Sequence, residues 1–163
     1  KETTTIGPLI DSNAAEDVKS LIEDAKIKGA RVELGGDSCD MGDNFINPTI
    51  LSNINTSMRV FNEEIFGPVA PIIKFETENE AIELANQTDF GLAAYFYSRD
   101  VGRVYRVSEK LEFGIIGVNE GIISNEMAPF GGIKESGNGR EGSKYGLDDY
   151  LEIKYVCVGG INE

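Results

Sequence analysis

The pattern that most restricts the fold is an alternation of strand-like and helix-like segments between residues 69 and 118. Three short apolar segments in this region are typical of buried strands: residues 71–75, 93–97 and 114–118. The first intervening segment opens with Thr77 and Glu80, which form a capping box, and the second opens with Asp100, a favourable N-cap. Because parallel strands need crossover connections, this order favours an α/β fold built on a parallel sheet.

Two further segments flank this region. An apolar stripe at Val18, Leu21, Ile22 and Ala25 predicts a helix that begins after Asp11 and closes at Gly29, and a short strand is expected at residues 31–34. About 36 residues follow, with one extended piece at 45–51, and their large apolar side chains favour order over disorder. At the other end, residues 150–158 alternate between apolar and polar, which predicts an edge strand or one that pairs with a partner.

The composition excludes several functional classes. The 163 residues carry a net charge of −13, so binding to nucleic acid or to an anionic membrane surface is not expected. No apolar run reaches 18 residues, and the sequence contains no histidine. His-based triads and most catalytic zinc sites are therefore ruled out, and we expect no metal. The two cysteines suit a reducing compartment, and we expect the cytoplasm, with an organelle matrix as the alternative.

Two motifs in the sequence are misleading. Residues 137–142 match G-x-G-x-x-G, but a dinucleotide-binding fingerprint must follow a buried strand, and the residues before it are polar. Cys39 lies in a polar segment and Cys157 in a strand-like pattern, so neither has the base or helix N-terminus that activates a thiol. No other residue stands out as a nucleophile, and the chain looks catalytically incomplete.

The segment 63–69, EEIFGPV, holds a candidate binding site. A carboxylate at this position can accept two hydrogen bonds from a vicinal diol such as a ribose, and the neighbouring Phe66 can pack against a heteroaromatic ring. A solvated acidic turn next to a core phenylalanine explains the same residues, and the pattern alone favours that simpler interpretation.

This segment is also part of a wider resemblance. EEIFGPV, then NQTDFGLAAYFYSRD at 86–100 and PFGGIKESGNGRE at 129–141, resemble the C-terminal part of the aldehyde dehydrogenase superfamily. The resemblance extends from Gly7 to Gly160 and is closest to its succinate-semialdehyde dehydrogenases, through VNEGIIS at 118–124 and the segment after Arg140. It implies a three-layer, parallel-sheet catalytic domain, here incomplete, over residues 1–149, followed by an oligomerisation strand and tail over 150–163.

The resemblance also implies that most of the catalytic apparatus lies outside this chain. In the superfamily the Gly-rich coenzyme-binding segment, the general-base Glu and the nucleophilic Cys all precede the matched region. We therefore expect a C-terminal fragment that is inactive alone. Residues 33–36, ELGG, imitate the general-base motif, but their surroundings match a later, non-catalytic segment, so Glu33 is not expected to be the base.

Five residues acquire roles from the resemblance. Glu64 matches the Glu that binds the nicotinamide ribose of NAD or NADP, and Phe66 the aromatic residue beside the nicotinamide. Ser124 matches a serine that holds the substrate carboxylate, Phe130 an aromatic wall of the aldehyde pocket, and Glu141 a buried proton-relay Glu.

The implied activity is the oxidation of succinate semialdehyde to succinate, in a homo-oligomer that associates through Leu151 to Val158. Asn125, where a second serine can occur, leaves room for another substrate such as glutarate semialdehyde. A non-catalytic α/β association module is the alternative from a different functional class.

Overall fold

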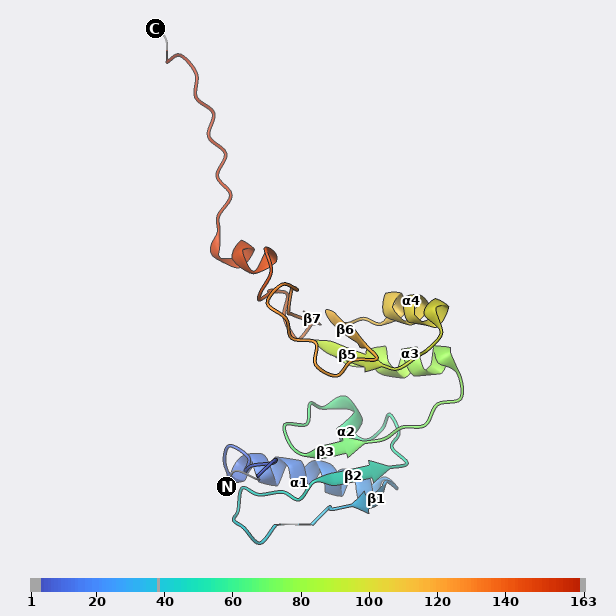
Figure 1. Cartoon of the computed structure of the whole chain (residues 1–163). Helices are drawn as coiled ribbons and strands as arrows, with labels where there is room; N and C mark the ends of the chain where they lie inside the picture. Colours follow the sequence, from blue (N-terminus) through green and yellow to red (C-terminus); the bar gives the residue numbers. More distant parts are fainter. Residues whose placement is uncertain (1–3, 38, 162–163) are drawn as a thin grey trace. The chain divides into compact units, whose positions relative to one another are not determined.

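The computed structural model describes residues 4–37 and 39–161, which form two compact units that divide after Glu76 (Figure 1). The first unit contains the helices α1 (Ser12–Ile27) and α2 (Arg59–Asn62) and the strands β1 (Arg31–Leu34), β2 (Thr49–Ser52) and β3 (Val69–Pro71). The second contains α3 (Glu78–Asn86), β4 (Phe90–Gly91), β5 (Ala93–Phe96), α4 (Val101–Lys110), β6 (Ile115–Val118), β7 (Ile133–Lys134) and the 3₁₀ helix η1 (Tyr145–Tyr150). The α/β class predicted from the sequence is confirmed.

Helix α1 supplies the core of the first unit. Its N-cap Asp11 accepts a hydrogen bond from the Ala14 amide at 2.8 Å, and the chain leaves the helix through Gly29 at φ 99°. The predicted apolar stripe is buried against residues of the long following segment, among them Leu51, Met58 and Val60. The predicted helix and the predicted strand at 31–34 are thus confirmed. The large apolar residues of the following segment pack in the core, as expected.

The sheet of the first unit has the order β1-β2-β3, with β1 and β2 antiparallel and β2 and β3 parallel. The strand expected at residues 71–75 instead occupies Val69–Pro71, so that prediction is largely wrong. The Ile72 amide donates one more bond to the Leu51 carbonyl, at 2.8 Å. Beyond it no ladder continues, because β2 ends at Ser52 and Asn53 turns the chain with φ 58°.

The second unit contains the parallel pair that the sequence predicts. Strands β5 and β6 run parallel, in register from Ala93↔Ile115 to Phe96↔Val118, with α4 as their connection. Thr77 and Asp100 cap α3 and α4 as expected, by accepting from the amides of Glu80 and Arg103. Strand β3 hydrogen-bonds to β2 in the first unit, so the three predicted strands belong to two described sheet pieces, β1-β2-β3 and β5-β6.

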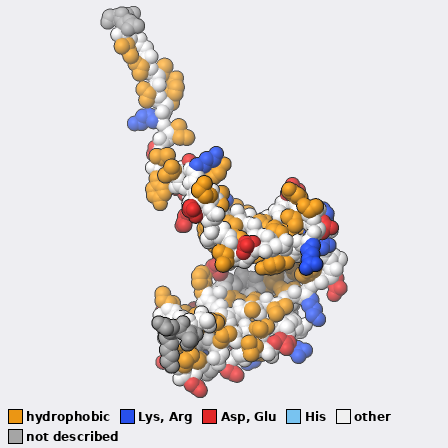
Figure 2. Space-filling view, viewed as in Figure 1, with side chains coloured by type: hydrophobic (Ala, Val, Ile, Leu, Met, Phe, Trp, Pro, Cys, Tyr) orange, Lys and Arg blue, Asp and Glu red, His pale blue; other side chains and the backbone are white. Residues whose placement is uncertain are grey.

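The expected tail strand forms no ladder with the residues that the structure describes. Tyr150 ends η1, and residues 151–160 contain neither helix nor strand (Figure 1). Their apolar side chains are exposed (Figure 2), namely Leu151, Ile153, Tyr155, Val156 and Val158. A strand requires a hydrogen-bonded neighbour, and this segment has none in the single chain. Its role in association, and with it the predicted boundary at 149/150, stays a prediction.

No helix in residues 4–37 and 39–161 is both long and apolar enough to cross a bilayer.

Candidate active site

Two adjacent carboxylates follow α2, Glu63 and Glu64, and they differ in their partners. Arg59, on the first turn of α2, binds Glu63 with two parallel contacts: Nε to Oε1 at 2.7 Å and Nη2 to Oε2 at 2.8 Å. The guanidinium stabilises the ionised carboxylate and lowers the pKa of Glu63. Arg59 also donates to the Ser20 hydroxyl at 2.8 Å, and its amide donates to Asp24 at 2.9 Å. Glu63 therefore belongs to a set of contacts that ties α2 to α1.

Glu64 and Phe66 both face solvent. Ile65, between them, packs against the core, whereas Glu64 is exposed and Phe66 keeps 76% of its surface accessible. This in–out alternation is that of an extended chain, in which residues i and i+2 lie on the same side. Within the part of the chain that the structure describes, the Glu64 carboxylate makes no hydrogen bond or ion pair. The two predicted coenzyme contacts are therefore presented together, without competing partners.

Gly67 fixes the end of this segment. A Cβ at Gly67 would lie 2.7 Å from Cγ2 of Val18, a buried residue of α1, so only glycine permits the approach. The next residue, Pro68, accepts a hydrogen bond from the Thr49 amide at 2.8 Å as the chain enters β3. Glu64 and Phe66 thus project from a short segment that is anchored at both ends.

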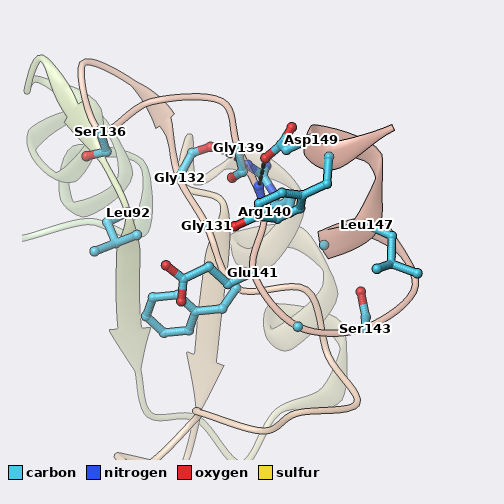
Figure 3. A pocket seen from close by; sticks show the side chains of 14 residues that line it. Leu92, Gly131, Gly132, Ser136, Gly139, Arg140, Glu141, Ser143, Leu147 and Asp149 are labelled. Atoms are coloured by element: carbon cyan, nitrogen blue, oxygen red, sulfur yellow. Dashed lines mark hydrogen bonds between the residues drawn. The ribbon is translucent and has the colours of Figure 1, made fainter. Parts of the chain in front are cut away.

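The other predicted residues lie in the second unit, where Phe130 and Glu141 are paired through their backbones. The Phe130 amide donates to the Glu141 carbonyl at 2.9 Å, and the Glu141 amide donates to the Phe130 carbonyl at 2.7 Å. Both residues line an open pocket of about 660 Å³ between the glycine-rich segment and η1 (Figure 3). The Glu141 side chain is exposed rather than buried, which differs from the burial that the resemblance implied.

The loop that carries Ser124 is joined to the same region. The Ser143 amide donates to the Glu126 carbonyl at 2.9 Å, and a Cβ at Gly142 would come within 3.0 Å of the Ala128 carbonyl oxygen. Asn125 closes a turn, because its Oδ1 accepts from the Met127 amide at 2.8 Å. Ser124 is exposed and does not line the pocket, and its hydroxyl has no partner in the described ranges.

Sequence reasoning missed Arg140, which organises the pocket wall. Its Nη1 donates to three backbone carbonyls, Gly132 at 2.7 Å, Asn138 at 3.1 Å and Gly139 at 2.9 Å. Its backbone amide donates to the Asp149 carboxylate at 3.4 Å, and both residues are labelled in Figure 3. Gly137 and Gly142, both at positive φ, form turns here. No local pattern predicts an arginine that binds backbone carbonyls, so the sequence offered no signal for it.

Two other motif residues have structural contacts. Glu33 lies on β1, where it accepts a hydrogen bond from the Ser52 hydroxyl across the strand pair and lies 3.6 Å from Arg31. Cys39 is half-buried and Cys157 is exposed in the tail, and both are free thiols. Among the residues described, no group of three or more histidines, cysteines or carboxylates could hold a metal ion.

The profile of the aldehyde dehydrogenase family matches residues 1–156, and the chain belongs to this family. A solved structure of an Escherichia coli NADP-dependent enzyme superposes with a TM-score of 0.94 and 58% identity, over 98% of this chain and 33% of that one. Betaine aldehyde dehydrogenase from Staphylococcus aureus, solved with NAD⁺, superposes with a TM-score of 0.86 and 41% identity, over 93% of this chain and 31% of that one.

Curated relatives show which kinds of aldehyde dehydrogenase the chain is similar to. The chain is 60% identical over 155 residues to the NADP⁺ succinate-semialdehyde dehydrogenase of E. coli, covering 95% of this chain and 32% of that protein. It is 58% identical over 158 residues to 3-sulfolactaldehyde dehydrogenase of Pseudomonas putida, covering 97% and 32%. The human mitochondrial succinate-semialdehyde dehydrogenase is 56% identical over 161 residues, covering 99% and 30%. The chain thus spans about a third of the length of each of these relatives.

Proposed function

We propose that the chain is the coenzyme- and substrate-contacting third of an NAD(P)-dependent dehydrogenase that oxidises succinate semialdehyde to succinate. The observation that carries the proposal is the backbone pairing of Phe130 with Glu141, which joins the Ser124 loop to the glycine-rich pocket. The 60% identity to the E. coli succinate-semialdehyde dehydrogenase supports the same substrate.

The first unit fits the nicotinamide end of the coenzyme. The Glu64 carboxylate is exposed and has no protein partner among the described residues, so both oxygens can accept from the ribose hydroxyls. Phe66 offers an exposed aromatic face on the same side of the segment. When bound, the nicotinamide would supply the hydride acceptor that the oxidation requires.

The second unit fits the substrate. The Ser124 hydroxyl is free to donate to a carboxylate, and such a hydrogen bond to a charged group contributes about 1.5–3 kcal/mol. Phe130 forms an apolar wall, and Glu141 presents an exposed carboxylate beside it for proton transfer. Asn125 contributes less directly, since its Oδ1 already accepts from the Met127 amide.

The 163 residues do not supply the nucleophile or the general base in this proposal. Cys39 and Cys157 are free thiols that lie outside the described helices, and Glu33 accepts a hydrogen bond from Ser52 across β1 and β2. The isolated chain should therefore give no aldehyde-dependent formation of NADH or NADPH. Turnover that disappears in a Cys39→Ala variant would contradict this assignment.

A second candidate substrate is 3-sulfolactaldehyde, favoured by the 58% identity to the P. putida dehydrogenase for that compound. Glutarate semialdehyde is a third. All three carry an anionic group remote from the aldehyde, so one hydroxyl donor at Ser124 serves each of them. They are distinguished by comparing kcat/KM for the three compounds.

We also propose that Leu151 to Val158 pairs with a second copy of the chain. These residues are extended, exposed and without a ladder partner, and antiparallel pairing across a two-fold axis would satisfy both backbones. The charge of −13 disfavours nucleic acid and anionic membranes as alternative partners. The two free cysteines fit a reducing compartment, the cytoplasm or an organelle matrix.

The proposal is tested with a chimera. Residues of this chain replace the matched 155-residue segment of the E. coli NADP⁺ succinate-semialdehyde dehydrogenase, which supplies the remaining two thirds. The chimera should oxidise succinate semialdehyde with NADP⁺, and a Glu64→Ala variant of it should lose most of this activity while keeping its thermal stability. A folded chimera without activity would overturn the proposal.

A further inference from the structure

Asn119 occupies the point at which the chain leaves the parallel sheet of the second unit. Its amide donates to the Phe96 carbonyl at 3.0 Å, which adds one bond to the β5–β6 ladder. Its own backbone has φ 57°, the left-handed conformation that few residues other than glycine and asparagine adopt readily. The ladder therefore ends here, and the loop toward Ser124 begins in a new direction.

Beyond this point the side chain of Asn119, and not its backbone, hydrogen-bonds to the segment after β5. Its Oδ1 accepts from the Ser98 amide at 2.8 Å, and its Nδ2 donates to the Ser98 carbonyl at 2.7 Å. In a continued parallel ladder, the backbones of two different residues would make these two bonds to Ser98. Asparagine combines the required donor and acceptor in one planar group and also tolerates the left-handed backbone.

We call the two bonds between Asn119 and Ser98 a clamp. Ser98, on the other side of this clamp, is itself held by hydrogen bonds. Ser98 lies between β5 and α4, and its Oγ accepts from the Asp100 amide at 3.1 Å. Asp100 in turn caps α4 by accepting from the Arg103 amide at 2.7 Å. Asn119 therefore fixes the first residue of the loop to the turn that starts a ten-residue helix.

The loop is held at both ends, and between them by the turn at Asn125 and by the bond from the Ser143 amide to the Glu126 carbonyl. Next to Asn119, Oε1 of Glu120 accepts from the amides of Gly121 at 2.9 Å and Ile122 at 3.2 Å. At the far end, Phe130 is bridged to Glu141. Ser124 is five residues after Asn119 and is exposed, so its position depends on the direction in which the loop departs.

We propose that Asn119 is a positioning residue for substrate recognition: its double bond to Ser98 directs the loop so that Ser124 meets the anionic end of the aldehyde. The inference rests on the proposed function of Ser124. Asn119 itself touches no substrate, so its effect should fall on the binding of anionic aldehydes and not on the chemical step.

The test uses the chimera with Asn119→Gly. Glycine keeps the left-handed backbone without strain and removes both side-chain bonds. We expect KM for succinate semialdehyde to rise about tenfold, with kcat and the kcat/KM for butanal, an uncharged aldehyde of equal length, within about twofold. Hydrogen exchange of the Ser98 amide and of residues 119–130 should become faster.

A matched control separates positioning from general loss of stability. Asn86 makes the same kind of clamp elsewhere in the unit, accepting from the Glu112 amide at 2.9 Å and donating to the Lys110 carbonyl at 2.8 Å. Asn86→Ala should lower the melting temperature without raising KM. An equal rise in KM in both variants, or an unchanged KM and unchanged loop exchange in Asn119→Gly, would overturn the proposal.

A double variant distinguishes this inference from the proposed function. If Asn119 acts through Ser124, Asn119→Gly combined with Ser124→Ala should be no worse on succinate semialdehyde than Ser124→Ala alone, within about twofold. Full additivity would contradict the inference. If Ser124→Ala alone lowers kcat/KM equally for both aldehydes, the proposed role of Ser124 is wrong. The hydrogen exchange of the Ser98 amide then still decides whether the clamp orders the loop.

Discussion

Phe130 and Glu141 exchange two backbone hydrogen bonds, at 2.9 and 2.7 Å, across a loop that contains β7 and the turn at Gly137. The pairing joins an apolar side chain and a carboxylate from the two ends of the glycine-rich segment on one pocket wall. Arg140, next to Glu141, holds the intervening loop through three carbonyls. Phe130, the proposed wall of the substrate site, and Glu141, the proposed proton-transfer residue, are therefore held next to each other by their own backbones.

The adjacent carboxylates Glu63 and Glu64 should respond differently to the same substitution. Glu63→Gln weakens the two contacts with Arg59, so it should lower the melting temperature and leave KM for NADP⁺ unchanged. Glu64→Gln should leave the melting temperature unchanged and raise KM for NADP⁺ about tenfold, because one charge-assisted acceptor is lost. Thermal unfolding and steady-state kinetics of the chimera check both results, and a coenzyme effect in Glu63→Gln alone would reverse the assignment.

Ser124→Ala should change substrate preference more than stability. The variant loses one hydrogen bond to a charged carboxylate, so kcat/KM for succinate semialdehyde should fall about tenfold to a hundredfold. The value for butanal should change by less than about twofold, because that aldehyde has no carboxylate to bind. Equal losses on both aldehydes would mean that Ser124 only supports the fold of the loop.

Glu78 makes the stability of the second unit dependent on pH. It accepts from Arg103 Nε at 2.8 Å and from Arg106 Nε at 3.2 Å, and these two guanidinium groups lower the pKa of Glu78 from 4.5 to about 2. A depressed pKa stabilises the folded state above the ordinary value, and this contribution disappears as the pH falls from 4.5 toward about 2.

The Glu78→Gln variant should therefore melt at a lower temperature than the parent chain at neutral pH. The difference should shrink steadily as the pH is lowered below 4.5. Glu109→Gln, an exposed position on α4 without an ion pair in the described residues, serves as the control and should show little difference at any pH. A Glu78→Gln difference that is constant down to pH 3 would contradict the ion-pair explanation.

Truncation after Asp149 should shift the chain toward the monomer. The removed segment carries exposed Leu151, Ile153 and Tyr155 and makes no ladder with residues 4–37 or 39–149. The far-ultraviolet circular dichroism of α1, α3 and α4 should therefore be retained, while the sedimentation coefficient falls. An oligomeric mass that survives the truncation would place the interface elsewhere.

The local elements of the fold could be predicted because their signals are local. Asp11, Thr77 and Asp100 cap helices at the predicted places, and Gly29 ends α1 at positive φ. The pairing of strands is not a local property: residues 69–71 resemble the other buried strands, yet they pair with β2, more than fifteen residues earlier. The short helix α2 was also missed, because its start is fixed by Asp24, 35 residues away, which accepts from the Arg59 amide.

The candidate site shows the same limit. Glu64 and Phe66 could be proposed from residue type and resemblance, but the sequence could not show that Arg59 would occupy Glu63 and leave Glu64 free. Asn119 and Arg140 gave no recognisable pattern, because each acts on backbone atoms that its own neighbours do not define. The alternating tail predicted a strand, but a strand needs a hydrogen-bonded partner, and the described residues of this chain provide none, so that strand stays a prediction.

We propose that this chain gives a dehydrogenase its preference for an anionic aldehyde. The most direct measurement is the ratio of kcat/KM for succinate semialdehyde to that for butanal in the chimera. The ratio should exceed about tenfold, and Ser124→Ala should reduce it to near unity. A chimera that turns over both aldehydes but prefers butanal, or whose ratio does not respond to Ser124→Ala, would contradict the account.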